Sequence, residues 1–276
     1  MSVQPGNEVA FDLAACIGCG KCSGDCAPGI ISMDGGKPRI QPDVAERCIV
    51  CQHCLAICPV GAVSVNGLKP AVSSGVGRGD FDALEAQIKR RRSIRAFSSE
   101  PVDRATLDEL LAVTAYAPTG SNVRERRFAV VLDPAVMAEL RDRTARILVE
   151  KAETLPEDVS WLVGAARVWL DEGRDVIFRT APHLIVVSVG PGASCPAEDA
   201  VIALTHFDLL AQSRGIGTTW CGMFYRVLRY VPEARDWLGI PADYDIGYAM
   251  LFGRSAVSYA RTAQYAPENV AIIDKL

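Results

Sequence analysis

The sequence predicts an α+β protein of two domains, in which a small cysteine-rich domain precedes a larger domain with a central sheet flanked by helices. Eight of the ten cysteines lie between Cys16 and Cys58 in two similar runs. The stretch "NGLKPAVSSGVGRGD", residues 66–80, is rich in Gly, Ser and Pro, as linkers are. After it, helical periodicity alternates with short apolar runs. We therefore predict a first domain over residues 1–68, a linker over 69–80 and a second domain over 81–276.

The cysteine-rich domain is an internal duplication. The run "CIGCGKCSGDCAPG" begins at Cys16 and the run "CIVCQHCLAICPVG" begins at Cys48, so that each cysteine of the second run lies 32 residues after its counterpart in the first. The similarity continues beyond the cysteines, because "GIISM" from Gly29 aligns with "GAVSV" from Gly61 at the same offset. A fixed period of this kind indicates a repeated structural unit.

The spacing of these cysteines predicts two [4Fe–4S] clusters. A C-x2-C-x2-C loop supplies three ligands to one cluster, and the fourth ligand comes from the other motif. Zinc needs only two C-x2-C pairs, and disulfides suit secreted domains, whereas the start "MSVQPGNEVAFD" lacks the features of a secretory signal. Zinc and disulfides are the alternatives. His53 lies between ligand cysteines and is expected beside a cluster or in solvent. The predicted ligands are Cys16, Cys19, Cys22 and Cys58 for one cluster and Cys48, Cys51, Cys54 and Cys26 for the other.

On these motifs, residues 8–68 resemble bacterial-type two-cluster ferredoxins. Cys58 is followed by Pro59, as in that family, whereas Cys26 is followed by Ala27 and only then by Pro28. The resemblance implies that this domain carries electrons.

The second domain is predicted to place helices and strands around one sheet. Helices are expected over residues 81–93, 106–117, most of 134–177 and 196–215, with Asp103 as a cap of the second and Gly215 at the end of the last. Strands are expected from the apolar runs at residues 127–133, 183–190, 216–224 and 246–253.

Three segments of this domain could hold a cofactor. "RRRSIRAF" places several arginines and a serine at the end of a helix, where they could bind a phosphate or form a solvated basic patch. "APTGSN" (residues 117–122) is a small-residue loop, and "GIGTTWCG" (residues 215–222) leads from a helix into a strand. Each is common in ordinary proteins. In this order, over residues 81–265, they resemble the nitroreductase family of FMN enzymes.

This resemblance implies a set of FMN-binding residues. The arginine-rich segment would hold the phosphate, helped by a basic residue near the C-terminus. The small-residue loop would reach the flavin of the partner subunit, which implies a homodimer. The strand after "GIG" would face flavin N5 and O4. The implied residues are Arg91, Arg92, Ser93, Arg95, Pro118, Thr119, Gly120, Asn122, Cys221, Gly222 and Arg261. The chain departs from the family pattern at "VRERRF" after Asn122, where relatives have Q-P-W, and at Tyr265.

Together the two domains predict an FMN-dependent oxidoreductase. Electrons from an external low-potential donor such as ferredoxin would pass through two [4Fe–4S] clusters to FMN. From FMN the electrons would be transferred to a small-molecule acceptor such as a nitroaromatic, a quinone or an activated alkene. FMN can take electrons singly and release them in pairs, so no catalytic acid or base is predicted. The alternative is an electron-relay subunit whose acceptor is a partner protein. No G-x-G-x-x-G follows a strand to mark a Rossmann nicotinamide site.

Composition narrows the class of protein. The net charge of −4 gives no basic field for nucleic acid. No apolar run is long enough to span a membrane, and "APHLIVVSVG" is far too short. A soluble cytoplasmic protein is expected.

Overall fold

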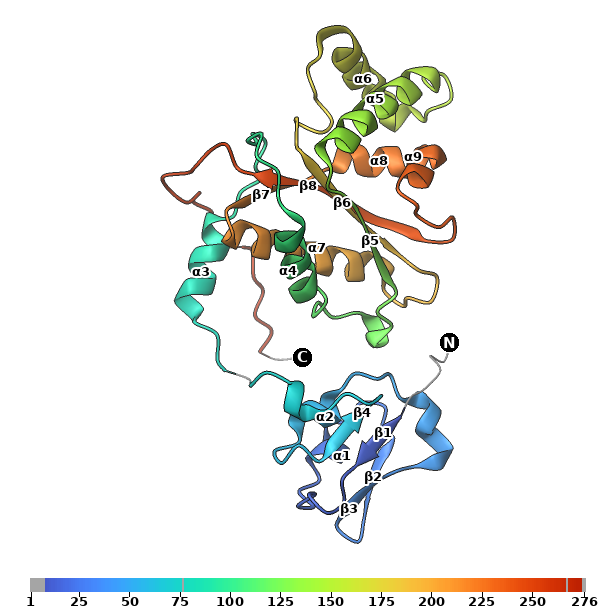
Figure 1. The fold of residues 1–276 in the computed structure, drawn as a ribbon, viewed down its shortest axis with the longest axis vertical. Helices are drawn as coiled ribbons and strands as arrows, with labels where there is room; N and C mark the ends of the chain where they lie inside the picture. Colours follow the sequence, from blue (N-terminus) through green and yellow to red (C-terminus); the bar gives the residue numbers. More distant parts are fainter. Residues whose placement is uncertain (1–7, 76, 267, 275–276) are drawn as a thin grey trace. The chain divides into compact units, whose positions relative to one another are not determined.

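The computed structural model describes residues 8–75, 77–266 and 268–274, which fold into two compact units (Figure 1). The first unit contains the N-terminal segment up to Arg78 and two loops, Pro118–Glu125 and Gly190–Pro196. The second unit contains Gly79–Ala117, Arg126–Val189 and the chain from Ala197 onward. The predicted α+β class is confirmed.

The first unit is built from two small antiparallel pairs of strands. Strand β1 (Val9–Phe11) pairs with β4 (Val63–Val65), and β2 (Ile31–Asp34) pairs with β3 (Lys37–Ile40) in a hairpin. The first unit also contains two short helices, α1 (Lys21–Gly24) and α2 (His53–Ile57), and the 3-10 turns η1 (Pro42–Arg47) and η2 (Pro70–Val72), besides the 3-10 turn of the Pro118–Glu125 loop. Its core is small and consists of Ile30, Ile31, Leu55, Val63 and Val65 with the cysteines Cys22 and Cys54.

The backbone of the first unit repeats with the sequence. Helix α2 follows α1 at the same offset as the cysteines, and each helix is preceded by a residue in the left-handed conformation. Four pairs of equivalent residues have positive φ angles, namely Gly18 (71°) with Val50 (53°), Gly20 (71°) with Gln52 (63°), Gly29 (68°) with Gly61 (64°) and Gly35 (54°) with Gly67 (76°). A β-branched residue such as valine rarely adopts this conformation. The two cysteine runs therefore form loops of the same shape even where the second lacks glycine.

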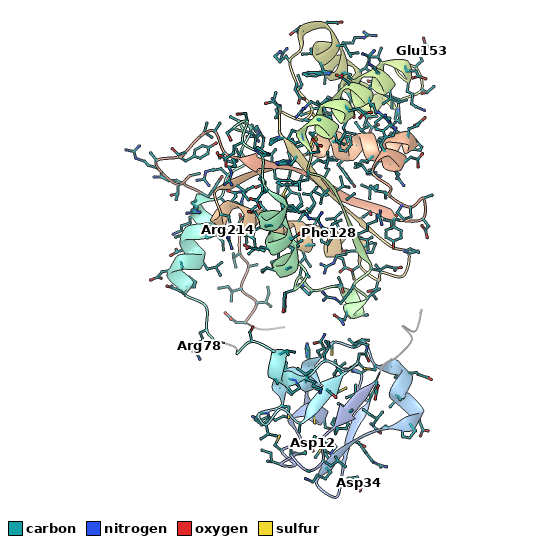
Figure 2. The ribbon with its side chains drawn as sticks, viewed as in Figure 1. Asp12, Asp34, Arg78, Phe128, Glu153 and Arg214 are labelled. Atoms are coloured by element: carbon teal, nitrogen blue, oxygen red, sulfur yellow. The ribbon has the colours of Figure 1, made fainter. Side chains whose placement is uncertain are left out.

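The turn into the first cysteine run is held by Asp12, which is labelled in Figure 2. Its carboxylate accepts hydrogen bonds from the backbone N–H groups of Ala14 and Ala15, each at 3.0 Å. Its carbonyl accepts the N–H of Cys16 at 3.0 Å. An aspartate that bonds the backbone two and three residues ahead stabilises such a turn locally.

The second unit is organised around a four-stranded antiparallel sheet of order β5-β6-β8-β7. The strands are β5 (Arg126–Val131), β6 (His183–Val189), β7 (Ile216–Trp220) and β8 (Asp245–Arg254). Every residue of β6 is buried, as expected for a central strand covered on both faces. All four strands were predicted from their apolar runs, and their existence is confirmed.

Helices cover both faces of this sheet. One face, which includes Leu184, Val186, Ala249 and Leu251, shares a core with helices α5 (Pro134–Glu150), α6 (Trp161–Glu172), α8 (Gly222–Tyr230) and α9 (Pro232–Trp237). Successive strand residues face opposite sides, so Phe252 points to the other face. There it meets Phe207 of helix α7 (Pro196–Ser213) edge-on, with ring centroids 5.5 Å apart.

Helices α3 (Phe81–Arg90) and α4 (Arg104–Thr114) precede the sheet and were both predicted. The predicted cap of α4 is confirmed, because the Asp103 carboxylate accepts the N–H of Thr106 at 2.8 Å. Gly215 follows α7 with a φ of 73°, the left-handed conformation that ends many helices. The remaining 3-10 turns are η3 (Gly120–Asn122) and η4 (Glu157–Val159).

The sequence analysis was wrong about residues 221–224, which were expected to continue a strand. Strand β7 ends at Trp220, Cys221 is the N-cap of α8, and Gly222 is the first residue of that helix. The helix begins there because the N–H of Tyr225 bonds the carbonyl of Cys221 at 3.0 Å. The signal for it is the helical spacing of the buried residues Phe224, Val227 and Leu228.

Among the described helices, none combines the length and the apolar character needed to cross a bilayer.

Candidate functional site

The first cysteine site is a hollow in the N-terminal unit, walled by four cysteines and by apolar side chains. Three of these cysteines come from the first run and the fourth comes from the second. Two backbone N–H groups point at sulfur, since Gly18 donates to Cys16 Sγ at 3.4 Å and Ala62 donates to Cys58 Sγ at 3.2 Å. The four cysteines are Cys16, Cys19, Cys22 and Cys58.

The second cysteine site is a hollow in the same unit. Its cysteines are grouped in the reciprocal way, three from the second run and one from the first. His53 also lines this hollow, but its side chain is mostly exposed and its Nδ1 lies 3.4 Å from Asp25 Oδ2. The four cysteines are Cys26, Cys48, Cys51 and Cys54.

The four cysteines of each group line a hollow, and their sulfur atoms do not converge on the position of one ion. Within the described ranges, no three His, Cys, Asp or Glu side chains form a group that could hold a single metal ion. Burial raises the pKa of the Cys54 thiol to about 11 and also raises that of Cys22, because desolvation disfavours the thiolate. A metal-bound cysteine must lose its proton, so a bound cluster would have to offset this cost. The four thiols that line each hollow suit a polynuclear cluster.

The arginine-rich segment lies beside strand β7 in the second unit. It leaves helix α3 at Arg91 and extends the edge of the sheet, because the N–H of Ile94 donates to Thr218 O at 2.8 Å and Ser93 bridges Thr218 in parallel. The hydroxyl of Thr219 also donates to Ile94 O. The strand therefore fixes the backbone of the segment at its centre.

Arg92 has a guanidinium nitrogen that suits an anion. Its Nη1 donates to Lys89 O at 2.9 Å and to Arg91 O at 2.6 Å. Its Nη2 is buried and has no hydrogen-bond partner among the described residues. A buried charged donor without a partner is costly, and a phosphate oxygen would satisfy it. Arg95 is exposed, and its Nη1 lies 3.5 Å from Ser93 O. The binding of a phosphate by this segment stays a prediction.

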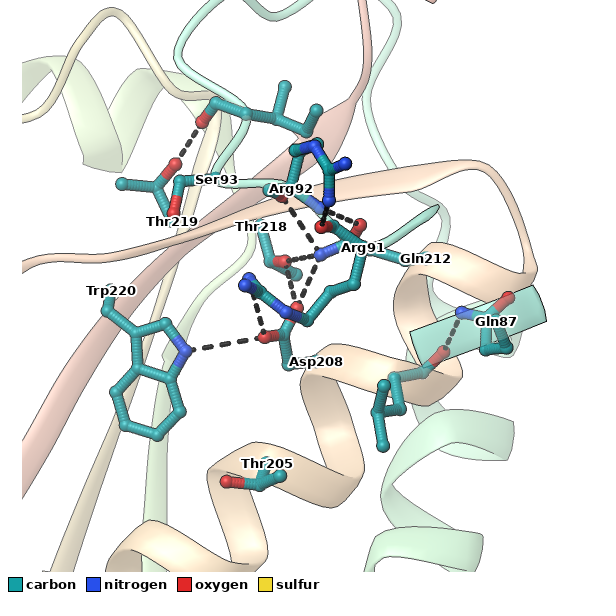
Figure 3. A network of polar contacts seen from close by, with 12 residues as sticks. Gln87, Arg91, Arg92, Ser93, Thr205, Asp208, Gln212, Thr218, Thr219 and Trp220 are labelled. Atoms are coloured by element: carbon teal, nitrogen blue, oxygen red, sulfur yellow. Dashed lines mark hydrogen bonds and ion pairs between the residues drawn. The ribbon is translucent and has the colours of Figure 1, made fainter. Parts of the chain in front are cut away.

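Behind this segment lies a buried polar network that the sequence analysis missed (Figure 3). Asp208 of α7 is 2% exposed, and its Oδ1 accepts from Gln212 Nε2 at 2.6 Å and from the Thr218 hydroxyl. Its Oδ2 accepts from Trp220 Nε1 at 3.3 Å and lies 3.7 Å from Arg91 Nη1. We call Asp208, Gln212, Thr218 and Trp220 the Asp208 network.

Cys221 and Gly222 occupy the turn from β7 into α8. The Cys221 thiol donates to Ile177 O at 3.4 Å, and burial raises its pKa to about 12, so it stays protonated and is no nucleophile. A side-chain carbon added to Gly222 would lie 3.0 Å from Tyr248 Oη. Tyr248 in turn stacks on Tyr225, with ring centroids 4.6 Å apart. The aromatic residues beside Gly222 come from separate elements, and no local sequence signal marks them.

The small-residue loop belongs to the first unit. Asn122 Nδ2 donates to the carbonyls of Ile49 at 2.9 Å and Val50 at 3.1 Å, in the loop between Cys48 and Cys51. Of the other residues predicted here, Thr119 Oγ1 accepts the N–H of Arg124 at 3.1 Å, Pro118 is exposed, and a side-chain carbon on Gly120 would lie 2.4 Å from Ser194 Oγ. At Gly120 the loop therefore packs closely against the side chains of Ser194 and Cys195.

Arg261 follows β8 in the C-terminal segment. It is exposed and makes no hydrogen bond or ion pair with the residues that the structure describes. The structure thus gathers Arg91, Arg92, Ser93 and the Asp208 network beside β7, and no hydrogen bond or ion pair of the described residues joins Arg261 to them.

Comparison with protein families identifies both parts of the chain. A family model for the nitroreductase family matches residues 88–254. A second model, for a 4Fe-4S dicluster domain, matches residues 15–62.

The similarity to individual proteins covers only part of this chain. The chain is 28% identical over 134 residues to an iodotyrosine deiodinase of Thermotoga neapolitana, a match that covers 47% of this chain and 68% of that protein. It is 41% identical over 59 residues to a 5,6-dimethylbenzimidazole synthase of Rhodobacter capsulatus, which covers 21% of this chain and 29% of that protein.

Solved structures share the fold. A nitroreductase with bound FMN from Bacteroides fragilis has a TM-score of 0.57 at 22% identity, covering 69% of this chain and 98% of that chain. One with bound FMN from Desulfitobacterium hafniense has a TM-score of 0.53 at 25% identity, covering 69% and 97%.

Proposed function

The chain belongs to the nitroreductase family and carries a 4Fe-4S dicluster domain ahead of that family's domain, and from this premise we propose that it is an FMN-dependent oxidoreductase fed by its own clusters. Electrons enter from a low-potential donor such as ferredoxin, pass through two [4Fe–4S] clusters to FMN, and leave to an organic acceptor. The observation that carries the proposal is the pair of hollows, each walled by four cysteines, in a chain that also matches the nitroreductase family.

The cysteines of each hollow are proposed as the ligands of one cluster. Each hollow takes its fourth cysteine from the other run, which is the exchange expected of a two-cluster domain. The backbone N–H groups of Gly18 and Ala62, which point at sulfur, would stabilise negative charge on the cluster bound there. The apolar walls would keep water away from both sites.

The second unit is proposed to hold FMN by the residues implied by the family. FMN accepts electrons singly and can release them in pairs, which matches a one-electron supply to a two-electron acceptor. Arg92 would direct its unpartnered Nη2 at the phosphate, with Arg91, Ser93 and Arg95 beside it. The turn at Cys221 and Gly222 would offer backbone to the flavin ring, and the protonated Cys221 thiol plays no chemical part.

The acceptor is proposed to be a nitroaromatic, a quinone or an activated alkene. The deiodinase of Thermotoga neapolitana, which is similar over 47% of this chain, adds a halogenated aromatic such as an iodotyrosine to the compounds worth testing. All ten cysteines are free, which suits a reducing compartment, and we place the protein in the cytoplasm.

We further propose a two-fold symmetric homodimer, as is common in this family. Pro118, Thr119, Gly120 and Asn122 would complete the flavin site of the partner subunit, so that bound FMN stabilises the dimer by mass action. Sedimentation with and without FMN tests this, and a monomer that retains its full flavin would remove these four residues from the site.

The proposed activity is tested on protein prepared without oxygen. We expect about eight iron atoms and one FMN per chain, from two four-iron clusters and one flavin site. After reduction with reduced ferredoxin, the flavin absorbance should recover when an acceptor of the proposed classes is added. Arg92→Ala should weaken FMN binding about ten- to a hundredfold, whereas Arg104→Ala, on the surface of α4, should leave it unchanged. Bound zinc with little iron, or a protein without flavin affinity, would contradict the proposal.

A further inference from the structure

A buried carboxylate and a glutamine lie directly behind the proposed phosphate segment. Asp208 and Gln212 are four residues apart on α7, so both side chains point to the same side of the helix (Figure 3). A buried carboxylate is costly unless donors surround it. Here Gln212, Thr218 and Trp220 donate to it, and the Arg91 guanidinium stands 3.7 Å away.

The side-chain amide of Gln212 forms hydrogen bonds with both the N–H and the carbonyl group of Arg92. The N–H of Arg92 donates to Gln212 Oε1 at 3.0 Å, and Gln212 Nε2 donates to Arg92 O at 3.1 Å. One amide side chain therefore bonds both polar groups of one residue, as a neighbouring strand would. This contact bridges 120 positions of sequence and ends at the residue whose Nη2 lacks a partner.

The carboxylate of Asp208 decides which way the amide of Gln212 faces. A carboxylate only accepts hydrogen bonds, so it must meet the NH₂ group of Gln212, and the amide oxygen is left for the Arg92 N–H. If Gln212 were turned over, its oxygen would face Asp208, and its NH₂ would face a backbone N–H. Asp208 thus holds Gln212 in the one orientation that fixes Arg92.

The same carboxylate holds Arg91. The Arg91 side chain is 37% exposed, so one side of its guanidinium faces Asp208 while another remains open to a ligand. An arginine bound to a fixed carboxylate loses less conformational entropy when it binds an anion, because part of that entropy is already lost.

We propose that Asp208 and Gln212 are positioning residues that give the flavin site its preference for a phosphorylated flavin. They touch the backbone of Arg92 and the guanidinium of Arg91 and need not touch the flavin ring. The inference rests on the proposed function, in which the Arg91–Arg95 segment holds the FMN phosphate. Neither residue belongs to the motifs from which that segment was identified.

The test compares two ligands that differ only in the phosphate. Dissociation constants for FMN and riboflavin are measured on the full-length protein stripped of flavin. In Gln212→Ala we expect FMN affinity to fall about tenfold, through the loss of the two bonds to Arg92, with riboflavin affinity unchanged. Asp208→Asn should also lower FMN affinity without changing riboflavin affinity. The NH₂ group of the asparagine would face either the NH₂ group of Gln212 or the donors of Trp220 and Arg91, so that two donors would meet.

Two further variants sharpen the result. Because the two residues act as a unit, the double variant Asp208→Asn/Gln212→Ala should cost little more than the larger single change. Gln87→Ala is the matched control, because the side chain of Gln87 donates from Nε2 to Leu209 O at 2.9 Å and so joins α3 to α7, whereas its bond to the phosphate segment, from the N–H of Arg91 to Gln87 O at 3.2 Å, is made by the backbone and is kept in the variant. It should leave the preference for FMN unchanged.

The outcomes separate the inference from the proposed function. If Gln212→Ala and Asp208→Asn keep the wild-type preference for FMN, or lose both flavins equally, the inference is overturned and the phosphate segment stands. If the wild-type protein itself binds riboflavin as tightly as FMN, the proposed phosphate segment is wrong, and the inference fails with it. Gln212 is half-buried, so its alanine variant is expected to fold even if Asp208→Asn does not.

Discussion

Gly18 shows how one residue supports a cluster-binding loop. Its φ of 71° favours glycine, and a side-chain carbon there would lie 2.5 Å from the carbonyl oxygen of Gly36, in the turn of the β2–β3 hairpin. That hairpin also holds the loop through Lys37, whose Nζ donates to Cys16 O at 2.6 Å. The loop can close only if position 18 has no side chain.

We expect Gly18→Ala to cost the protein its first cluster. Iron content should fall from about eight to about four atoms per chain, because the displaced hairpin turn opens the loop that begins at Cys16. Gly67→Ala is the matched control, since Gly67 has a similar φ of 76° but open space around it. It should lower stability by roughly 1 kcal/mol and keep its iron. Equal iron loss in the two variants would contradict the steric explanation.

His183 should make stability depend on pH. The ring is 0% exposed, and its Nε2 accepts the N–H of Val102 at 2.8 Å, so burial lowers its pKa in the folded protein. Below pH 6.5, which is about the ordinary pKa of histidine, this side chain is protonated in the unfolded chain but stays neutral in the folded protein. The free energy of unfolding therefore falls as the pH is lowered. Denaturant unfolding from pH 7.5 to 5.5 should show this slope in the wild type and a shallower one in His183→Gln. Identical slopes would rule His183 out as the cause.

At the scale of elements, β8 and α7 approach more closely than two side chains would allow. A side-chain carbon on Gly247 of β8 would lie 2.1 Å from Cβ of Ala200 of α7 and 3.0 Å from Val187 O. Since the backbone surrounds this point, no rotamer change can relieve the contact. The close packing of α7 against β8, and with it the position of Asp208, depends on this glycine.

Gly247→Ala should therefore destabilise the protein by about 1–3 kcal/mol, as overpacking of a core does. Gly164→Ala is expected to stabilise the protein instead, because Gly164 is exposed within α6 and a side-chain carbon added there would have no atom within 4 Å. There alanine should raise stability by about 0.5–1 kcal/mol. Chemical denaturation of both variants measures the difference, and a loss of the same size at both sites would show that close packing at Gly247 is not responsible.

At the scale of the molecule, the two cysteine runs depend on each other. Cys26 is a member of the first run, yet it lines the hollow whose other three cysteines belong to the second. If it is the crossing ligand, the loss of one thiol in one run empties the site built by the other. The chain of electron carriers would then be broken ahead of the flavin.

Cys26→Ala should lose about half of the iron and its ferredoxin-dependent turnover, while FMN content stays unchanged. Direct chemical reduction of the flavin should still support turnover. The exposed Cys195, which lies outside both hollows, provides the control, and Cys195→Ala should behave as the wild type. Full iron content and undiminished donor-dependent turnover in Cys26→Ala would contradict both the ligand grouping and the proposed electron route.

Local patterns in the sequence identified much of this protein. The 32-residue offset from Cys16 to Cys48 predicted a duplicated unit, and the structure repeats its left-handed residues at that same offset. Strong apolar periods located helices such as α7 and strands such as β6, and the family prediction is confirmed. The cysteines are grouped as their spacing predicted, although their ligation, like the roles of Arg91–Arg95, stays a prediction.

What the sequence by itself determined are features carried by near neighbours in the chain: the cysteine spacing, the cap at Asp103 and the arginine-rich segment. Only the tertiary structure decided that Asp208 and Gln212 stand behind that segment, because their bonds join residues about 120 positions apart. It also decided that the chain turns from strand to helix at Cys221. A short apolar run suits either state until packing of Phe224, Val227 and Leu228 against the sheet selects the helix.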